Sequence, residues 1–277
     1  MIHSTFEISV NGQTAPLYTY LLDTTPELNG GKNRPVLIIC PGGGYTFTSD
    51  REAEPIAMQM NAAGFHAVIL RYSVKPAVFP TALVQLAKAV ELVRAHSDEW
   101  CLDPEKVFVM GFSAGGHLAA SLGVFWNKEI LTRELLPAPG LTADAIRSNT
   151  FRPNGLLLAY PVISSGEFAH QGSINTVLDG KEELRETISL ENQVDKDTPP
   201  AFLWHTFEDQ SVPVENSLLF AAALRRSGVP FELHVYPKGA HGLSLANEET
   251  AWTDRPLSPP GVDTWIKLAI NWIRNFR

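Results

Sequence analysis

The stretch VFVMGFSAGGHLAASLG, residues 107–123, changes from strand-forming to helix-forming residues within a few positions. Val107–Met110 are apolar and partly β-branched, which is typical of a short buried strand. His117–Leu122 are rich in alanine and leucine, which favour a helix. Ser113 stands between these segments, with a glycine two residues away on each side, in a G-x-S-x-G pattern. Because glycines permit a very tight turn, the pattern predicts a strained apex that exposes the Ser113 hydroxyl.

Strands and helices alternate along the rest of the chain. The apolar runs that predict strands lie at residues 35–40, 66–72, 106–111, 154–162, 201–207 and 231–237. The segments that predict helices lie at residues 49–64, 80–100, 216–228 and 264–276. Near the amino terminus, two alternating segments flank Asn11–Gln13, which predicts an antiparallel hairpin. This order predicts an α/β fold with a mostly parallel central sheet, helices on both faces and the hairpin at one edge.

Two segments interrupt this alternation, residues 127–154 and residues 164–200. Both are rich in proline, asparagine, threonine and charged residues, and neither has the pattern of a core element. Long irregular segments in compact domains often form lids or binding loops. We therefore expect a single domain over residues 1–277, with these two segments as candidate lid or binding-loop insertions.

The composition restricts the class of partner. Hydrophobic residues make up 44% of the 277 residues and charged residues 19%, which is typical of a globular chain with a sizeable core. A net charge of −8, with no dense run of lysine or arginine, argues against nucleic acid or an anionic membrane as a partner. No targeting signal is visible and no run reaches membrane-spanning length, so we expect a cytoplasmic protein. The cysteines, Cys40 and Cys101, lack the spacing of a disulfide framework or a zinc site.

A serine hydroxyl needs an adjacent base to act as a nucleophile at neutral pH. In its strand–turn–helix context, Ser113 is interpreted as the nucleophile, followed in chain order by an acid and a histidine. The histidines that follow it are His117, His170, His205, His234 and His241. We choose His241 as the base, because it lies in a glycine-containing loop after the last predicted strand, where such sheets bind ligands. His170, in an irregular insertion, remains an alternative.

The acid is expected at the end of the preceding strand, where Glu208 and Asp209 stand side by side. We choose Asp209, because a nearby proline begins the next helix and leaves a short loop that aims one carboxylate at the histidine. Glu208 is then expected to be solvated. Asp195 and Asp197 are less suitable, because they precede the strand.

Three consecutive glycines, Gly42–Gly44, follow the first central strand. A tetrahedral intermediate carries an oxyanion that needs preorganised N–H donors. Backbone N–H groups without side chains beside them approach a substrate oxygen closely, and the N–H of Ala114 after the nucleophile would add a further donor. A phosphate loop is disfavoured, because neither a GK[ST] sequence nor the G-x-G-x-x-G spacing is present.

Four parts of the sequence together resemble a known family: PGGGY at 41–45, GFSAGGHLAASLG at 111–123, YPVIS at 160–164, and residues 205–246. They resemble α/β-hydrolase serine esterases of the acetyl-xylan-esterase-like and hormone-sensitive-lipase-like branches, and the resemblance covers about residues 35–275. It implies the α/β-hydrolase fold and a reaction that uses neither a metal nor a cofactor. The site residues that it implies are a triad of Ser113, Asp209 and His241 and an oxyanion hole of Gly43, Gly44 and Ala114.

Pro41 stands where the lipase-like branch usually has histidine, which favours the acetyl-esterase-like branch. The chain is therefore predicted to hydrolyse carboxylic esters through an acyl-enzyme, with short acyl groups such as acetyl preferred. The expected partner is a small-molecule or oligosaccharide ester. Two alternatives are a serine peptidase of related fold, which usually carries a further domain for which this chain has no room, and a non-catalytic binding protein, which typically lacks a triad member.

Overall fold

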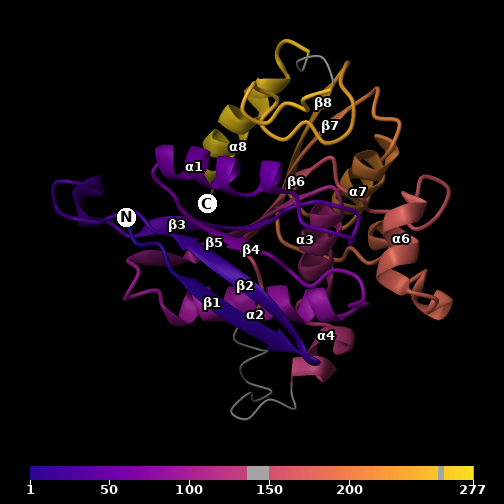
Figure 1. The fold of residues 1–277 in the computed structure, drawn as a ribbon, viewed down its shortest axis with the longest axis horizontal. Coiled ribbons are helices and arrows are strands. Elements are labelled where there is room, and N and C mark those ends of the chain that lie inside the picture. Colours follow the sequence, from indigo (N-terminus) through magenta and orange to yellow (C-terminus); the bar gives the residue numbers. More distant parts are fainter. Residues whose placement is uncertain (136–149, 255–258, 277) are drawn as a thin grey trace.

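The computed structural model describes residues 1–135, 150–254 and 259–276 of the chain (Figure 1). Among these residues, eight strands join one sheet in the order β1-β2-β4-β3-β5-β6-β7-β8. The strands are β1 Thr5–Val10, β2 Gln13–Tyr20, β3 Arg34–Cys40, β4 His66–Leu70, β5 Leu102–Phe112, β6 Gly155–Ala159, β7 Ala201–Thr206 and β8 Phe231–Tyr236. Strands β3 to β8 are parallel to one another, whereas β2 pairs antiparallel with both β1 and β4. The predicted fold class, with a hairpin at one edge, is confirmed.

Helices cover both faces of this sheet, as Figure 1 shows. Helices α2, α3 and α7 pack into one buried cluster and helices α1 and α8 into the other. The helices are α1 Glu54–Ala62, α2 Thr81–Ala95, α3 Ala114–Phe125, α4 Glu129–Leu135, α6 Gln171–Leu178, α7 Glu215–Arg226 and α8 Trp265–Arg274. In the described part of the chain, none of the helices is long and apolar enough to cross a membrane.

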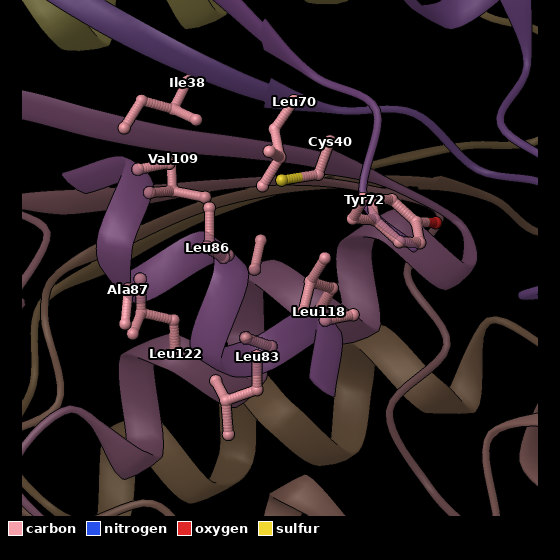
Figure 2. Close-up of a cluster of buried hydrophobic side chains, with 14 of the residues drawn as sticks. Ile38, Cys40, Leu70, Tyr72, Leu83, Leu86, Ala87, Val109, Leu118 and Leu122 are labelled. Carbon is pink, nitrogen blue, oxygen red and sulfur yellow. The ribbon is translucent and has the colours of Figure 1, made fainter. Parts of the chain in front are cut away.

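The central strand β3 supplies both cores, because successive side chains of a strand point to opposite faces. Val36, Ile38 and Cys40 enter the α2/α3 cluster, whereas Leu37 and Ile39 enter the α1/α8 cluster. Burial of such side chains contributes on the order of 1.5–3 kcal/mol each. Figure 2 shows the first cluster, in which strand and helix side chains meet: Ile38, Cys40, Leu70, Val109, Leu83, Leu86, Leu118 and Leu122. The two layers thus hold β5 and α3 rigidly around the turn that joins them.

One predicted helix begins later than its sequence suggests. Residues 49–64 were expected to be helical throughout. Instead, a single 3-10 turn covers Asp50–Glu52, the backbone kinks at Ala53, and α1 begins at Glu54. Pro55, which favours the first turn of a helix, fixes that start.

The two interrupting segments lie at different ends of the parallel strands. Segment 164–200 begins just after the carboxyl end of β6 and contains α6. Segment 127–154 begins beyond the carboxyl end of α3, and Asn154 accepts a hydrogen bond from the Val107 N–H, 3.1 Å away, beside the amino end of β6. Its described parts therefore lie away from Ser113, and residues 136–149, which make up the rest of the candidate insertion, lie outside the described residues.

Candidate active site

Ser113 sits on the turn between β5 and α3 with a strained backbone, φ 51° and ψ −116°. Both flanking glycines are required by packing. A Cβ at Gly111 would lie 2.1 Å from the Gly115 oxygen, and a Cβ at Gly115 would lie 2.1 Å from the Cys40 oxygen. The two glycines thus let the helix start directly against β3 and β5. The Ser113 hydroxyl is thereby fixed at the carboxyl edge of the sheet.

His241 lies within hydrogen-bond distance of two groups at once. Its Nε2 is 2.7 Å from the Ser113 Oγ, and its Nδ1 is 2.7 Å from the Asp209 Oδ2. Asp209 follows β7 and His241 follows β8, so the parallel pairing of these two strands sets the loops beside each other. Neutral imidazole that donates from Nδ1 to the carboxylate accepts at Nε2, which is the tautomer that a base for Ser113 needs.

The Asp209 carboxylate is completely buried and accepts three hydrogen bonds of 2.7 to 2.9 Å, besides a longer contact with His205. Its Oδ1 accepts from the backbone N–H groups of Ser211 and Val212, each at 2.9 Å. Its Oδ2 faces His241 and also the Nε2 of His205 at 3.4 Å. Burial alone would raise the pKa of Asp209, but the hydrogen bonds from His205, His241 and Val212 outweigh it and hold the pKa well below its usual range.

The neighbouring carboxylate does not face the histidine. Glu208 is exposed, and its Oε2 accepts a hydrogen bond from the Gly239 N–H at 3.3 Å. The structure therefore places Asp209, and not Glu208, against His241.

The glycine loop after β3 faces the same space. Gly43 has φ 132°, and a Cβ there would lie 2.1 Å from the Phe47 oxygen, so only glycine fits without rearrangement. Gly44 has φ 62° and more room, since Ser173 Oγ would be 3.7 Å away. Within the described ranges, the N–H groups of Gly43, Gly44 and Ala114 have no hydrogen-bond acceptor. These are the donors expected to meet a substrate oxyanion.

A pocket of about 220 Å³ opens above Ser113 and His241. Its wall also includes Phe47 and Trp252, whose side chains are largely exposed. The Arg51 guanidinium lies 3.9 Å from the centre of the Trp252 ring. The pocket thus combines a polar floor with an aromatic rim, and it is open enough to admit a substrate that extends into solvent.

The family of the chain follows from comparison with known proteins. The family model described as BD-FAE matches residues 22–224. The chain belongs to the BD-FAE family of α/β-hydrolase esterases. Among solved structures, it is similar to the acetyl ester-xyloside bifunctional hydrolase from Caldicellulosiruptor lactoaceticus, with 40% identity and a TM-score of 0.81 over 95% of this chain and 89% of that one. It is also similar to the carboxylesterase Cest-2923 from Lactobacillus plantarum, with 30% identity and a TM-score of 0.85 over 99% and 97% of the two chains.

Curated relatives of this BD-FAE chain are longer proteins. Endo-1,4-beta-xylanase B from Butyrivibrio fibrisolvens is 38% identical over 80% of this chain and 34% of its own length. Acetylxylan esterase from Xylanibacter ruminicola is 29% identical over 79% of this chain and 42% of its own length. The chain therefore spans about one third to two fifths of these two relatives.

The other histidines are placed away from the Ser113 hydroxyl or on the rim of the pocket. His117 is buried, with Nδ1 2.8 Å from the Tyr45 hydroxyl and Nε2 3.0 Å from the Ile188 oxygen. His170 lines the pocket, and its Nδ1 caps α6 by accepting from the Ser173 N–H at 3.2 Å. His234 pairs with Glu232 on β8. Within the described ranges, no group of three or more histidine, cysteine or acidic residues is arranged to hold a metal ion.

Three residues of the site were missed by sequence reasoning. His205 lies within the predicted strand 201–207 and is a buried histidine that Ser217 and Val212 hold, and its Nε2 also lies 3.4 Å from the Asp209 Oδ2. Glu52 had been placed on a helix, but it is a buried carboxylate that lines the pocket. Tyr160 belongs to the predicted strand 154–162 and directly follows β6 in the structure. Its ring packs edge-on against His241, with 5.1 Å between ring centres. Of these three residues, only Glu52 could have been suspected from the sequence, because it closely follows the glycine loop. Its position alone, however, does not distinguish a buried site residue from a solvated residue of a helix.

Proposed function

We propose that this chain hydrolyses carboxylic esters with short acyl groups, acetyl esters of carbohydrate in particular, through a covalent intermediate on Ser113. The observation that carries the proposal is the unbroken contact from Asp209 through His241 to Ser113, beside unpaired N–H groups. This arrangement has the three parts that acyl transfer needs: a nucleophile, an oriented base and oxyanion donors.

The reaction follows from the positions of these groups. The Ser113 Oγ forms a bond to the acyl carbon while its proton passes to the His241 Nε2. The carbonyl oxygen takes the negative charge and is met by the N–H groups of Gly43, Gly44 and Ala114. Collapse of the intermediate breaks the ester C–O bond, and the imidazolium donates its proton to the leaving alcohol. Water then repeats these steps and releases the acid and the free serine.

Asp209 contributes by charge and by orientation. Its carboxylate stays ionised because donors surround it, so it stabilises the imidazolium without taking the proton. The low pKa of Asp209 therefore serves the proposed reaction by keeping the negative charge beside His241.

A short acyl group is supported by the polar side chains in the pocket wall. Each methylene of a longer chain gains about 0.8 kcal/mol only where an apolar wall covers it. The 220 Å³ pocket has serine, arginine and histidine side chains in its wall beside the two aromatic residues. Names of two relatives, an acetylxylan esterase and an acetyl ester-xyloside hydrolase, support a carbohydrate acetate as the substrate.

The proposed nucleophile is tested by labelling and by substitution. A fluorophosphonate probe is expected to label the wild-type protein and not Ser113→Ala, which should fold normally and lose about 10⁴-fold or more in kcat. Retention of most activity by Ser113→Ala would contradict the assignment.

The substrate class is tested by a series of esters. We expect kcat/KM to be highest for C2 or C4 among p-nitrophenyl esters of C2, C4, C8 and C12 acids, and acetate to be released from acetylated xylo-oligosaccharides. Peptide anilides serve as the control for a peptidase. A maximum at C8 or beyond would overturn the short-chain proposal.

A further inference from the structure

We propose that Glu52 is a positioning residue that ties the glycine loop to the His241 loop through the hydroxyl of Tyr160. The proposal rests on the proposed function, because it concerns the same site. Glu52 touches neither Ser113 nor His241 through a hydrogen bond among the described residues, so it acts through its two partners.

The first partner is the glycine loop. The Gly42 N–H donates to the Glu52 Oε2 at 2.8 Å, and this carboxylate is buried. A Cβ at Gly42 would lie 2.7 Å from the same oxygen and 3.0 Å from the Ser113 Cβ, so the loop is confined between the carboxylate and the nucleophile. Fixing the Gly42 peptide sets the direction of the next two peptides, whose N–H groups are the proposed oxyanion donors.

The second partner is Tyr160, at the carboxyl end of β6. Its hydroxyl donates to the Glu52 Oε1 at 2.6 Å and accepts from the Ser244 N–H at 2.9 Å. Ser244 lies three residues after His241 and is also held by the Trp265 Nε1, which donates to its carbonyl at 2.9 Å. The Tyr160 ring meets the His241 ring at 73°. The hydroxyl therefore fixes the chain directly after the base.

A carboxylate suits this position better than an amide does. Each Glu52 carboxylate oxygen accepts one hydrogen bond, and both donors are buried. The pKa of Tyr160 is raised, first by burial and second by the nearby Glu52 carboxylate. The hydroxyl therefore stays protonated and can donate its hydrogen to Glu52. Glutamine offers a single acceptor oxygen, so Glu52→Gln leaves either the Gly42 N–H or the Tyr160 O–H without a partner. An unpaired buried donor is costly and displaces its neighbours.

The test compares Glu52→Gln and Tyr160→Phe with Glu54→Gln, an exposed glutamate two residues further along the chain. With p-nitrophenyl acetate, Glu52→Gln is expected to lower kcat 10- to 100-fold and to change KM less than 3-fold, because the oxyanion forms only after binding. Tyr160→Phe should lower kcat by a smaller factor, since the Gly42 contact remains. The double variant should fall no further than Glu52→Gln, because both act in one connection. Glu54→Gln should match the wild type.

A second measurement separates positioning from a general structural role. The rate of phosphonylation of Ser113 by a fluorophosphonate should fall with kcat in Glu52→Gln, while the near-ultraviolet circular dichroism remains native. Wild-type kcat in folded Glu52→Gln, or a change confined to KM, would overturn the proposal. If Glu52→Gln does not fold, Tyr160→Phe decides: wild-type kcat overturns the proposal, and a reduced kcat with unchanged KM supports it. Activity retained by Ser113→Ala would overturn the proposed function instead.

Discussion

The two halves of the candidate site are built in different ways. The half that would receive the oxyanion consists of main chain: the elbow at Ser113 and the glycine loop, in which Ser113, Gly43 and Gly44 have positive φ angles. The half that moves the proton consists of side chains, Asp209 and His241, which come from loops 32 residues apart and meet through hydrogen bonds. The main-chain half is sensitive to an added atom, at Gly43 above all, whereas the side-chain half is sensitive to a change of charge or hydrogen-bonding pattern.

This difference has a consequence for energetics. In the main-chain half, a single Cβ at Gly43 would overlap the Phe47 oxygen. In the side-chain half, hydrogen-bond donors keep the buried Asp209 carboxylate charged. Substitutions of similar size should therefore have unequal effects in the two halves.

The largest expected effect is in the side-chain half. Asp209→Asn removes the charge and reverses the hydrogen-bond preference at His241, so kcat should fall by about 10³- to 10⁴-fold with p-nitrophenyl acetate. Glu208→Gln is the matched control, since that side chain is exposed, and it should retain wild-type kcat. If Glu208→Gln proves the more damaging change, the acid has been assigned to the wrong carboxylate.

The next effect is in the main-chain half. Gly43→Ala forces the loop to move, and the loss of one oxyanion donor is expected to cost about 10²- to 10³-fold in kcat. Gly44→Ala is the comparison, because its Cβ would lie no nearer than 3.7 Å to the Ser173 Oγ and 4.0 Å to the Thr46 Oγ1, and it should cost less. Equal kcat values for the two variants would show that the steric argument for Gly43 does not hold.

A smaller effect is expected at His205, which lies beside the Asp209 carboxylate. His205→Gln removes the ring that faces Asp209 at 3.4 Å, and we expect a fall in kcat of about 10-fold, near the energy of one hydrogen bond to a charged group. His234→Gln, on the neighbouring strand and paired with Glu232, is the control and should leave kcat unchanged. Wild-type kcat in His205→Gln would show that the other donors suffice.

The last prediction concerns the free energy of unfolding and not activity. Burial lowers the pKa of His117 to about 4, whereas an unfolded histidine titrates near 6.5. Between these values the unfolded state binds more protons, so the free energy of unfolding falls as pH drops from about 6.5 to 4, by about 3 kcal/mol at most. Urea unfolding at a series of pH values should give this slope.

The matched variant for this measurement is His117→Gln. It keeps polar atoms beside Tyr45 and Ile188 but does not titrate, so part of the acid dependence should disappear. The remainder is expected from His66, whose pKa burial also lowers to about 4, and from His170, whose pKa is lowered by burial first. An unchanged slope in His117→Gln would contradict the role given to this histidine.

Much of the fold could be read from the sequence because it depends on local patterns. Alternation of apolar runs at β3 to β8 with helix patterns predicted the parallel sheet, and the residues around Asn11 predicted the hairpin. The kink at Ala53 was missed, because the helix pattern of residues 49–64 continues through it. Strand order and register then fix which loop ends meet, and no local pattern encodes that.

The sequence by itself determined the strand–turn–helix around Ser113, the glycine loop and the order of serine, aspartate and histidine. These follow from torsional freedom and side-chain periodicity, which neighbouring residues decide. Only the tertiary structure brings Asp209 into contact with His241, places His205 beside the acid, and connects the two halves through Glu52 and Tyr160. The physical reason is that hydrogen bonds such as that between Tyr160 and Glu52, 108 residues apart, depend on how whole strands pack side by side.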